Sequence, residues 1–182
     1  MLLFATRFND ETFKENKAWR LKNNYKGCIY NSPVTIGINI YPDTQLFILE
    51  MNNSKNKIEG IGVIKNRLIF DNTYNYKIYN DNNYNRYIYK VKYRIDRSDL
   101  TREEEKILNI LDILVFKGST HIKRGQGVTV LPDWIIKNRH FDFINFFKDL
   151  FRSRQNDIDN IPRQLERPIQ GHKHILKLIE DQ

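Results

Sequence analysis

Residues 45–64 read QLFILEMNNSKNKIEGIGVI, in which two apolar runs flank a short polar segment. The first run is dense in Leu, Phe and Ile, a composition typical of a strand that is covered on both faces. The polar segment predicts a turn, so the second run predicts a returning strand. Gly60 and Gly62 in that strand predict a bulge, or a place where another group approaches the backbone closely. We therefore expect a core hairpin with strands over 45–51 and 57–64 and a turn over 52–56.

Capping residues predict a helix on each side of the hairpin. A short buried strand is expected over 2–7, after which Asn9 and Asp10 can cap a helix that extends to about residue 23. Thr101 and Glu104 form a capping-box pattern at the start of a helix that extends to about residue 114. The inward positions expected in the first helix are Phe13, Ala18 and Leu21. Those expected in the second are Ile107, Leu108, Leu111 and Leu114.

A third strand is expected over 86–95, with an apolar face and a basic face. Side chains alternate along a strand, which places one set on each side. The first set is Tyr87, Tyr89, Val91, Tyr93 and Ile95. The second set is Arg86, Ile88, Lys90, Lys92 and Arg94. This face could meet an anion, or it could be an ordinary solvated surface.

The rest of the chain divides into a loop, helices and an arm. Residues 117–127 form a polar loop with three glycines, which we call the basic loop. A short strand over 128–131 and a helix from Pro132 follow it. The segment 141–151 is apolar at helical spacing, which predicts a helix that packs on the body of the protein or on a partner. Residues 153–171 predict a linker or extended arm.

Composition limits the class of protein. The chain has 182 residues, with 30 Lys and Arg against 22 Asp and Glu, a net charge of +8 that favours an anionic partner, nucleic acid before membrane. Its one cysteine excludes an internal disulfide and a cysteine-based zinc cluster. No apolar run approaches the roughly 20 residues that span a bilayer, and no signal peptide is evident, so we expect an intracellular protein. The abundance of residues with A/T-rich codons favours a large DNA virus or an A/T-rich microbe as the source.

The order of these elements resembles that of a known group of folds. The segments that carry the resemblance are 3–8 (LFATRF), 27–33 (GCIYNSP), the hairpin, 89–96 (YKVKYRID) and 123–136. Over about residues 2–138 the pattern is similar to the PUA-like barrels, and within them to YTH and EVE domains, readers of modified bases. The resemblance implies an α+β fold, a small, closed, mixed β-barrel flanked by helices over 1–138, with a C-terminal helix and arm over 139–182.

The resemblance also implies a pocket for one base. Its first aromatic wall would be Tyr30, beside the polar pair Asn31 and Ser32, and Tyr79 and Tyr84 match the spacing of the two later walls. YTH domains use tryptophan for these walls, whereas this chain holds tyrosine. Each tyrosine could instead be a half-buried barrel residue with its hydroxyl in water. We expect Trp19 and Trp134 to anchor helices in the core rather than to stack on bases.

Basic side chains would bind the nucleic-acid backbone, because such contacts give affinity without reading sequence. The candidates are Lys90, Lys92, Arg94, Lys117, His121, Lys123, Arg124 and Gln126. The alternative for the basic loop is a flexible solvated segment.

These patterns together predict a nucleic-acid-binding module that reads a modified, flipped or single-stranded base, with RNA expected rather than DNA. We expect no enzymatic activity, no cofactor and no metal, since no catalytic motif is complete. The alternative is a structural or interaction protein, such as a viral packaging or virion component, that docks a partner through the helix Phe141–Phe151.

Overall fold

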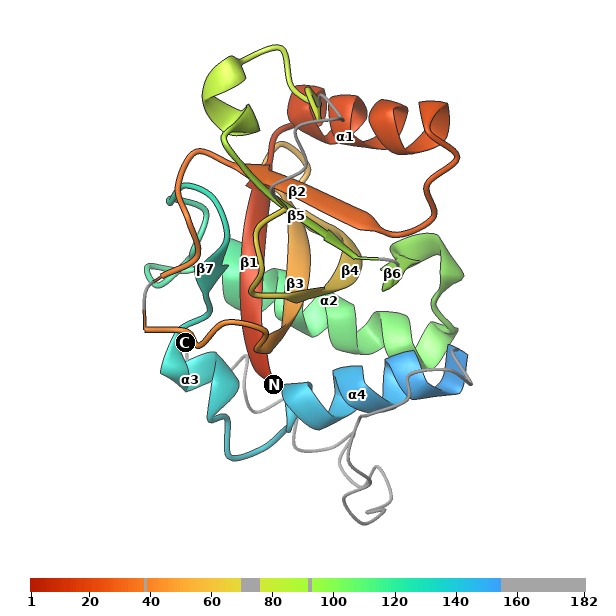
Figure 1. The fold of residues 1–182 in the computed structure, drawn as a ribbon. Helices are drawn as coiled ribbons and strands as arrows, with labels where there is room; N and C mark the ends of the chain where they lie inside the picture. Colours follow the sequence, from red (N-terminus) through yellow and green to blue (C-terminus); the bar gives the residue numbers. More distant parts are fainter. Residues whose placement is uncertain (38, 70–75, 92, 155–182) are drawn as a thin grey trace. The chain divides into compact units, whose positions relative to one another are not determined.

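A computed structural model describes residues 1–37, 39–69, 76–91 and 93–154 of the chain (Figure 1). Lys92 and the arm beyond residue 154 lie outside the described residues, so the predictions for them stay untested. The chain divides into two compact units, Met1–Leu131 and Pro132–Gln182, and each is described by itself.

Two β-sheets form the centre of the first unit. The larger sheet has the strand order β6-β4-β3-β1-β7, with β1 and β3 parallel and the other neighbours antiparallel. Its strands are β1 (Leu2–Phe8), β3 (Gln45–Asn52), β4 (Lys57–Lys65), β6 (Tyr93–Asp96) and β7 (Thr129–Val130). The smaller sheet pairs β2 (Cys28–Ser32) with β5 (Tyr87–Val91) in antiparallel fashion. The α+β class is thus confirmed, but the closed barrel is wrong, because the described strands pair as two separate sheets. The PUA-like assignment stays a prediction.

The core hairpin is confirmed as β3 and β4. Glu50 pairs with Gly60 and Met51 pairs with Ile58, so Glu59 is the additional residue of a β-bulge. Gly60 and Gly62 also lie where other groups approach the backbone. A Cβ added at Gly60 would lie 2.6 Å from Arg94 Nη2 and 2.7 Å from Glu50 Oε2, so both parts of the glycine prediction hold.

The larger sheet buries both of its faces. One face, with Phe4, Leu46 and Ile48, belongs to the same apolar cluster as β2 and β5. The other face carries Phe47 and Leu49, and helix α2 (Arg102–Phe116) contacts β4. Figure 1 shows β2 and β5 on one side of this sheet and α2 on the other. Because β3 is covered on both sides, its continuous apolar run is explained.

Both predicted capping helices form, but the inward face of the first one is different. Helix α1 (Asp10–Lys22) begins with a capping box between Asn9 and Thr12, and α2 begins with the predicted box between Thr101 and Glu104. The buried residues of α1 are polar, Asn16 and Arg20. Of the predicted inward residues, Phe13 is partly buried, Ala18 is exposed and Leu21 is 71% exposed.

The single strand expected over 86–95 is wrong. It is divided between β5, in the smaller sheet, and β6, at the edge of the larger sheet. The alternation of faces therefore does not continue from Lys90 to Arg94. A short 3-10 helix (Asn82–Asn85) precedes β5, and another (Arg97–Asp99) follows β6.

The described part of the second unit holds two helices. These are α3 (Asp133–Ile136) and α4 (Phe143–Arg154), with the expected break between them. Phe143, Phe147, Leu150 and Phe151 are buried and lie at helical spacing along α4. The predicted boundary after residue 138 lies inside this unit, between the two helices.

Candidate functional site

The tyrosines proposed as pocket walls do not line an open pocket together. Tyr30 is 1% exposed and donates its hydroxyl hydrogen to Glu50 Oε1 over 2.8 Å. Tyr79 is 4% exposed, and its hydroxyl oxygen accepts from Asn16 Nδ2 over 3.3 Å. Tyr84 is exposed and packs edge-on against Tyr79, with ring centroids 6.2 Å apart. The structure thus brings Tyr79 and Tyr84 together but places Tyr30 in the core, so the three-walled pocket is wrong.

The two polar residues expected at the base edge are also buried. Asn31 Nδ2 donates to the backbone oxygen of Tyr76 over 2.7 Å, while its Oδ1 is buried without a partner. Ser32 Oγ donates to the backbone oxygen of Val34 over 2.5 Å. Most of their hydrogen-bonding capacity is used to hold the chain itself, which is a structural role.

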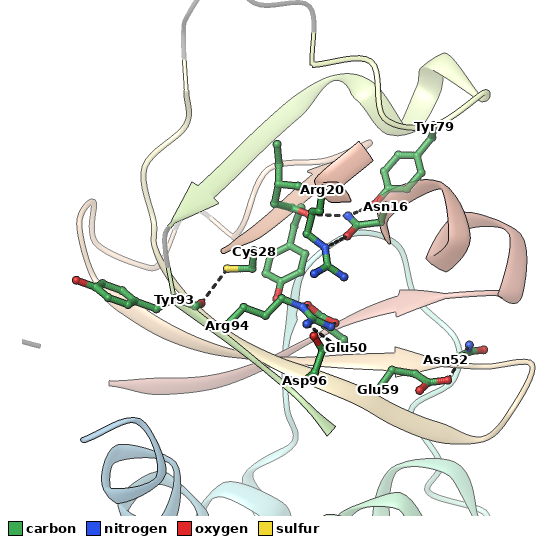
Figure 2. A network of polar contacts seen from close by, with 12 residues as sticks. Asn16, Arg20, Cys28, Glu50, Asn52, Glu59, Tyr79, Tyr93, Arg94 and Asp96 are labelled. Atoms are coloured by element: carbon green, nitrogen blue, oxygen red, sulfur yellow. Dashed lines mark hydrogen bonds and ion pairs between the residues drawn. The ribbon is translucent and has the colours of Figure 1, made fainter. Parts of the chain in front are cut away.

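A buried ion pair lies at the centre of the first unit (Figure 2). Arg94, on β6, donates from Nε to Glu50 Oε1 over 2.8 Å and from Nη2 to Glu50 Oε2 over 2.7 Å. Its Nη1 lies 2.6 Å from Asp96 Oδ1. Burial alone would lower the pKa of Arg94, but the charge and hydrogen bonds of Glu50 raise it, so the guanidinium stays charged. Arg94 is therefore not part of a cationic surface, and that prediction is wrong.

Cys28 lies beside this ion pair and is fully buried. Its Sγ lies 3.4 Å from the backbone oxygen of Tyr93. Burial, and next the charge of Glu50, raises the pKa of the thiol to about 12. A thiol in this environment is not a nucleophile near neutral pH, which supports the prediction of a small buried apolar residue.

A second buried group lies on the inward face of α1. Asn16 Nδ2 donates to the backbone oxygen of Ile29 over 2.7 Å, and Asn16 Oδ1 accepts from Arg20 Nε over 3.1 Å. In Figure 2 the Arg20 guanidinium points to the side on which Glu50 and Arg94 lie. Sequence reasoning missed this group, because only the tertiary structure shows which polar residues of a helix are buried.

An aromatic cage does form, but from other residues than those expected. The Lys90 ammonium lies 5.7 Å from the ring centroid of Trp19, 4.6 Å from that of Tyr25 and 5.0 Å from that of Tyr76. The Trp19 ring is tilted by 74° to Tyr25 and by 44° to Tyr76. We call these four residues the Lys90 cage. Such cation–π contacts contribute about 0.5–2 kcal/mol each, depending on desolvation.

Further lysines lie next to the Lys90 cage in the sequence. Lys26 follows Tyr25 directly, Lys77 follows Tyr76 directly, and Lys22 lies one helical turn after Trp19 on α1. All three are exposed, and none forms an ion pair with a described residue. Trp19 and Tyr25 are only partly buried. This surface therefore combines aromatic rings with unpaired positive charge.

The basic loop is held against the end of β1. Arg7 Nε donates to the backbone oxygen of Ile122 over 2.6 Å, and Asn53 Nδ2 donates to that of Lys123 over 2.9 Å. Its glycines adopt positive φ angles: Gly118 (75°), Gly125 (136°) and Gly127 (67°). Of its predicted contact residues, Lys117, Arg124 and Gln126 are exposed, whereas His121 and Lys123 are partly buried. No described residue forms an ion pair with the cations of this loop.

The chain was compared with known proteins, and no family model, curated protein or solved structure matches it. Within the described ranges, no helix is long and apolar enough to cross a membrane. The described residues also contain no group of three or more His, Cys, Asp or Glu side chains that could hold a metal ion. The site is therefore argued from its own geometry.

Proposed function

We propose that this chain binds single-stranded nucleic acid, RNA rather than DNA, on the surface around the Lys90 cage. The observation that carries the proposal is the position of the Lys90 ammonium between three aromatic rings, beside three unpaired lysines. Proteins that bind single strands combine a positive surface for the backbone with aromatic side chains on which bases stack. The net charge of +8 supports an anionic partner of this kind.

In this proposal the cage residues have different roles. Trp19 and Tyr25, which are partly buried, offer their accessible ring surface to unpaired bases. Each stacked base contributes about 1–3 kcal/mol. Lys90 holds the rings in place, and Lys22, Lys26 and Lys77 contact phosphates without reading sequence. The proposal does not include a base flipped between Tyr30, Tyr79 and Tyr84, because the first two are buried.

The test compares two triple variants with the same change of net charge. In the first, Lys22, Lys26 and Lys77 are replaced by Met. In the second, the control, Lys55, Lys106 and Lys137 are replaced by Met; each of these forms a surface ion pair within the described structure. Binding of a labelled single-stranded RNA is measured by fluorescence anisotropy over a range of salt concentrations, with a methylated RNA and a DNA strand as further probes.

The first variant should bind more weakly, and the slope of log K against log salt should fall by about 2, because about 0.7 is lost for each phosphate contact on a single strand. The control should keep the wild-type slope. Equal loss of affinity in both variants would contradict the proposed surface.

A structural or interaction role is favoured by one observation, the burial of the tyrosines expected to form the base pocket. The same titration separates the two functions. Binding that rests on cationic contacts weakens steeply with salt, whereas an apolar partner interface changes little.

A further inference from the structure

Arg20 differs from the other buried arginines of the described chain in its partners. Arg94 has Glu50 and Asp96, and Arg97 Nη1 and Nη2 donate to Asp112 Oδ2 over 2.7 Å and to Asn109 Oδ1 over 2.6 Å. Arg20 is 8% exposed, yet its one hydrogen bond runs from Nε to the neutral Asn16. Its two Nη atoms have no protein partner.

Burial of an unpaired charge is costly. Moving an ion out of water costs several kcal/mol even after relaxation, unless a partner of opposite charge compensates it. Glu50 is the acid on the side to which Arg20 points in Figure 2, but its two oxygens already accept three hydrogen bonds, from Tyr30 and Arg94. No ion pair between Arg20 and a described acid is formed.

Solvent still reaches the free end of Arg20. The buried side-chain atoms without a partner in the described structure are Asn31 Oδ1, Asn53 Oδ1 and His121 Nδ1. The Arg20 Nη atoms are not among them, so each keeps some contact with solvent. The two free nitrogens form the edge of a planar guanidinium, which matches two oxygens of one oxyanion.

We propose that the free edge of Arg20 binds a phosphate group. Asn16 orients the guanidinium through Nε, which leaves both Nη atoms to donate to two phosphate oxygens. The phosphate could be a free ion or part of a nucleotide strand, since the chemistry recognised is the same. The inference does not rest on the proposed function, because Arg20 is buried inside α1 and is not a member of the Lys90 cage.

The test uses thermal unfolding of the full chain in inorganic phosphate, with sodium chloride at matched ionic strength as the reference. The variants are Arg20→Met, Arg20→Lys and Lys17→Met. Lys17 is an exposed residue of α1 without an ion pair, so its replacement removes the same charge from the same helix. Line broadening in 31P NMR gives a second readout on the wild-type protein that needs no variant.

Phosphate should raise the wild-type unfolding temperature saturably, by about 5–10 °C at 100 times the dissociation constant. Lys17→Met should keep this response, Arg20→Lys should weaken it, and Arg20→Met should lose it. In phosphate-free buffer Arg20→Met should unfold at the wild-type temperature or above, because it removes an uncompensated charge. A comparison of 5′-phosphorylated with unphosphorylated RNA then distinguishes a terminal phosphate from an internal one.

Three results would overturn the proposal. They are a wild-type protein that shows neither a phosphate-dependent shift nor 31P broadening, an Arg20→Met protein that responds as the wild type does, and an Arg20→Met protein that is strongly destabilised without phosphate. The last result would mean that the fold itself compensates Arg20.

Discussion

Arg94 and Glu50 form a two-point ion pair in which the side chains are 1% and 2% exposed. The pair joins β6 to β3 across β4, and Gly60 of β4 leaves the space that it needs. A buried pair of this kind adds little over an apolar pair of the same volume, but the loss of one partner leaves a buried charge uncompensated.

Arg94→Met should therefore lower the free energy of unfolding by about 3–5 kcal/mol, measured by urea denaturation. The control is Arg67→Met, which breaks the exposed pair with Asp43 and should cost at most about 1 kcal/mol. Equal effects for the two variants would contradict the buried pair. Charge reversal at Arg94 would set two acids together in the core, so it is a test of folding and not of nucleic-acid binding.

Gly62 is the second position where the core has no room for a side chain. A Cβ there would meet the Tyr30 hydroxyl and would lie 2.8 Å from Cys28 Sγ. Gly62→Ala should destabilise the protein by about 1–3 kcal/mol, the usual cost of overpacking. Gly37→Ala is the matched control, since nothing lies within 4 Å of a Cβ at Gly37. A neutral Gly62→Ala variant would mean that β2 and β4 lie further apart than described.

Cys28 predicts how stability depends on pH. Burial raises the pKa of its thiol to about 12 in the folded protein, whereas an unfolded cysteine has a pKa of about 8.5. The unfolded chain therefore loses the proton first, and the stability that is fully present below pH 8.5 declines above it, by about 1.4 kcal/mol per pH unit.

The window from about pH 8.5 to 10 isolates this effect, because unfolded tyrosines titrate only at about 10. Urea denaturation should show the decline in the wild type and a flatter profile in Cys28→Ala. The same slope in both proteins would show that another group is responsible.

Arg7 should control the order of the basic loop. Its Nε bond to Ile122 and its Nη1 bond of 2.8 Å to Thr129 Oγ1 tie the loop and β7 to β1. Arg7→Met leaves the Ile122 carbonyl without this donor, at a cost of about 1–3 kcal/mol. Hydrogen exchange over residues 117–127 should become faster, whereas Thr129→Val, which keeps the Ile122 bond, should leave that loop closer to wild type. Unchanged exchange in Arg7→Met would assign the order of the loop to its glycines.

Local patterns predicted the hairpin and both capped helices, because apolar runs, turn residues and capping boxes act within a few residues of each other. The inward face of α1 could not be predicted in this way. Asn16 and Arg20 are buried because Ile29 and Tyr79, far along the chain, supply or surround their hydrogen bonds. The division of residues 86–95 between two sheets likewise depends on which strands lie beside them.

The expected aromatic cage was placed on the wrong residues for the same reason. Trp19, Tyr25, Tyr76 and Lys90 come from four segments, and no spacing between them marks a cage. The one sequence signal was the neighbourhood of Tyr25 and Lys26 after a helix that contains Trp19. Among tyrosines this frequent, spacing alone selected Tyr79 and Tyr84, of which the former is a core residue.

The fluorescence of Trp19 tests the proposed nucleic-acid surface most directly. The chain has two tryptophans, so Trp134→Phe leaves Trp19 as the sole reporter. Addition of single-stranded oligouridylate at low salt should quench its emission saturably, and high salt should reverse the effect, whereas Trp19→Phe, which retains Trp134, should show no quenching. RNA binding by anisotropy with unchanged Trp19 emission, or no binding at all, would contradict stacking of bases at the Lys90 cage.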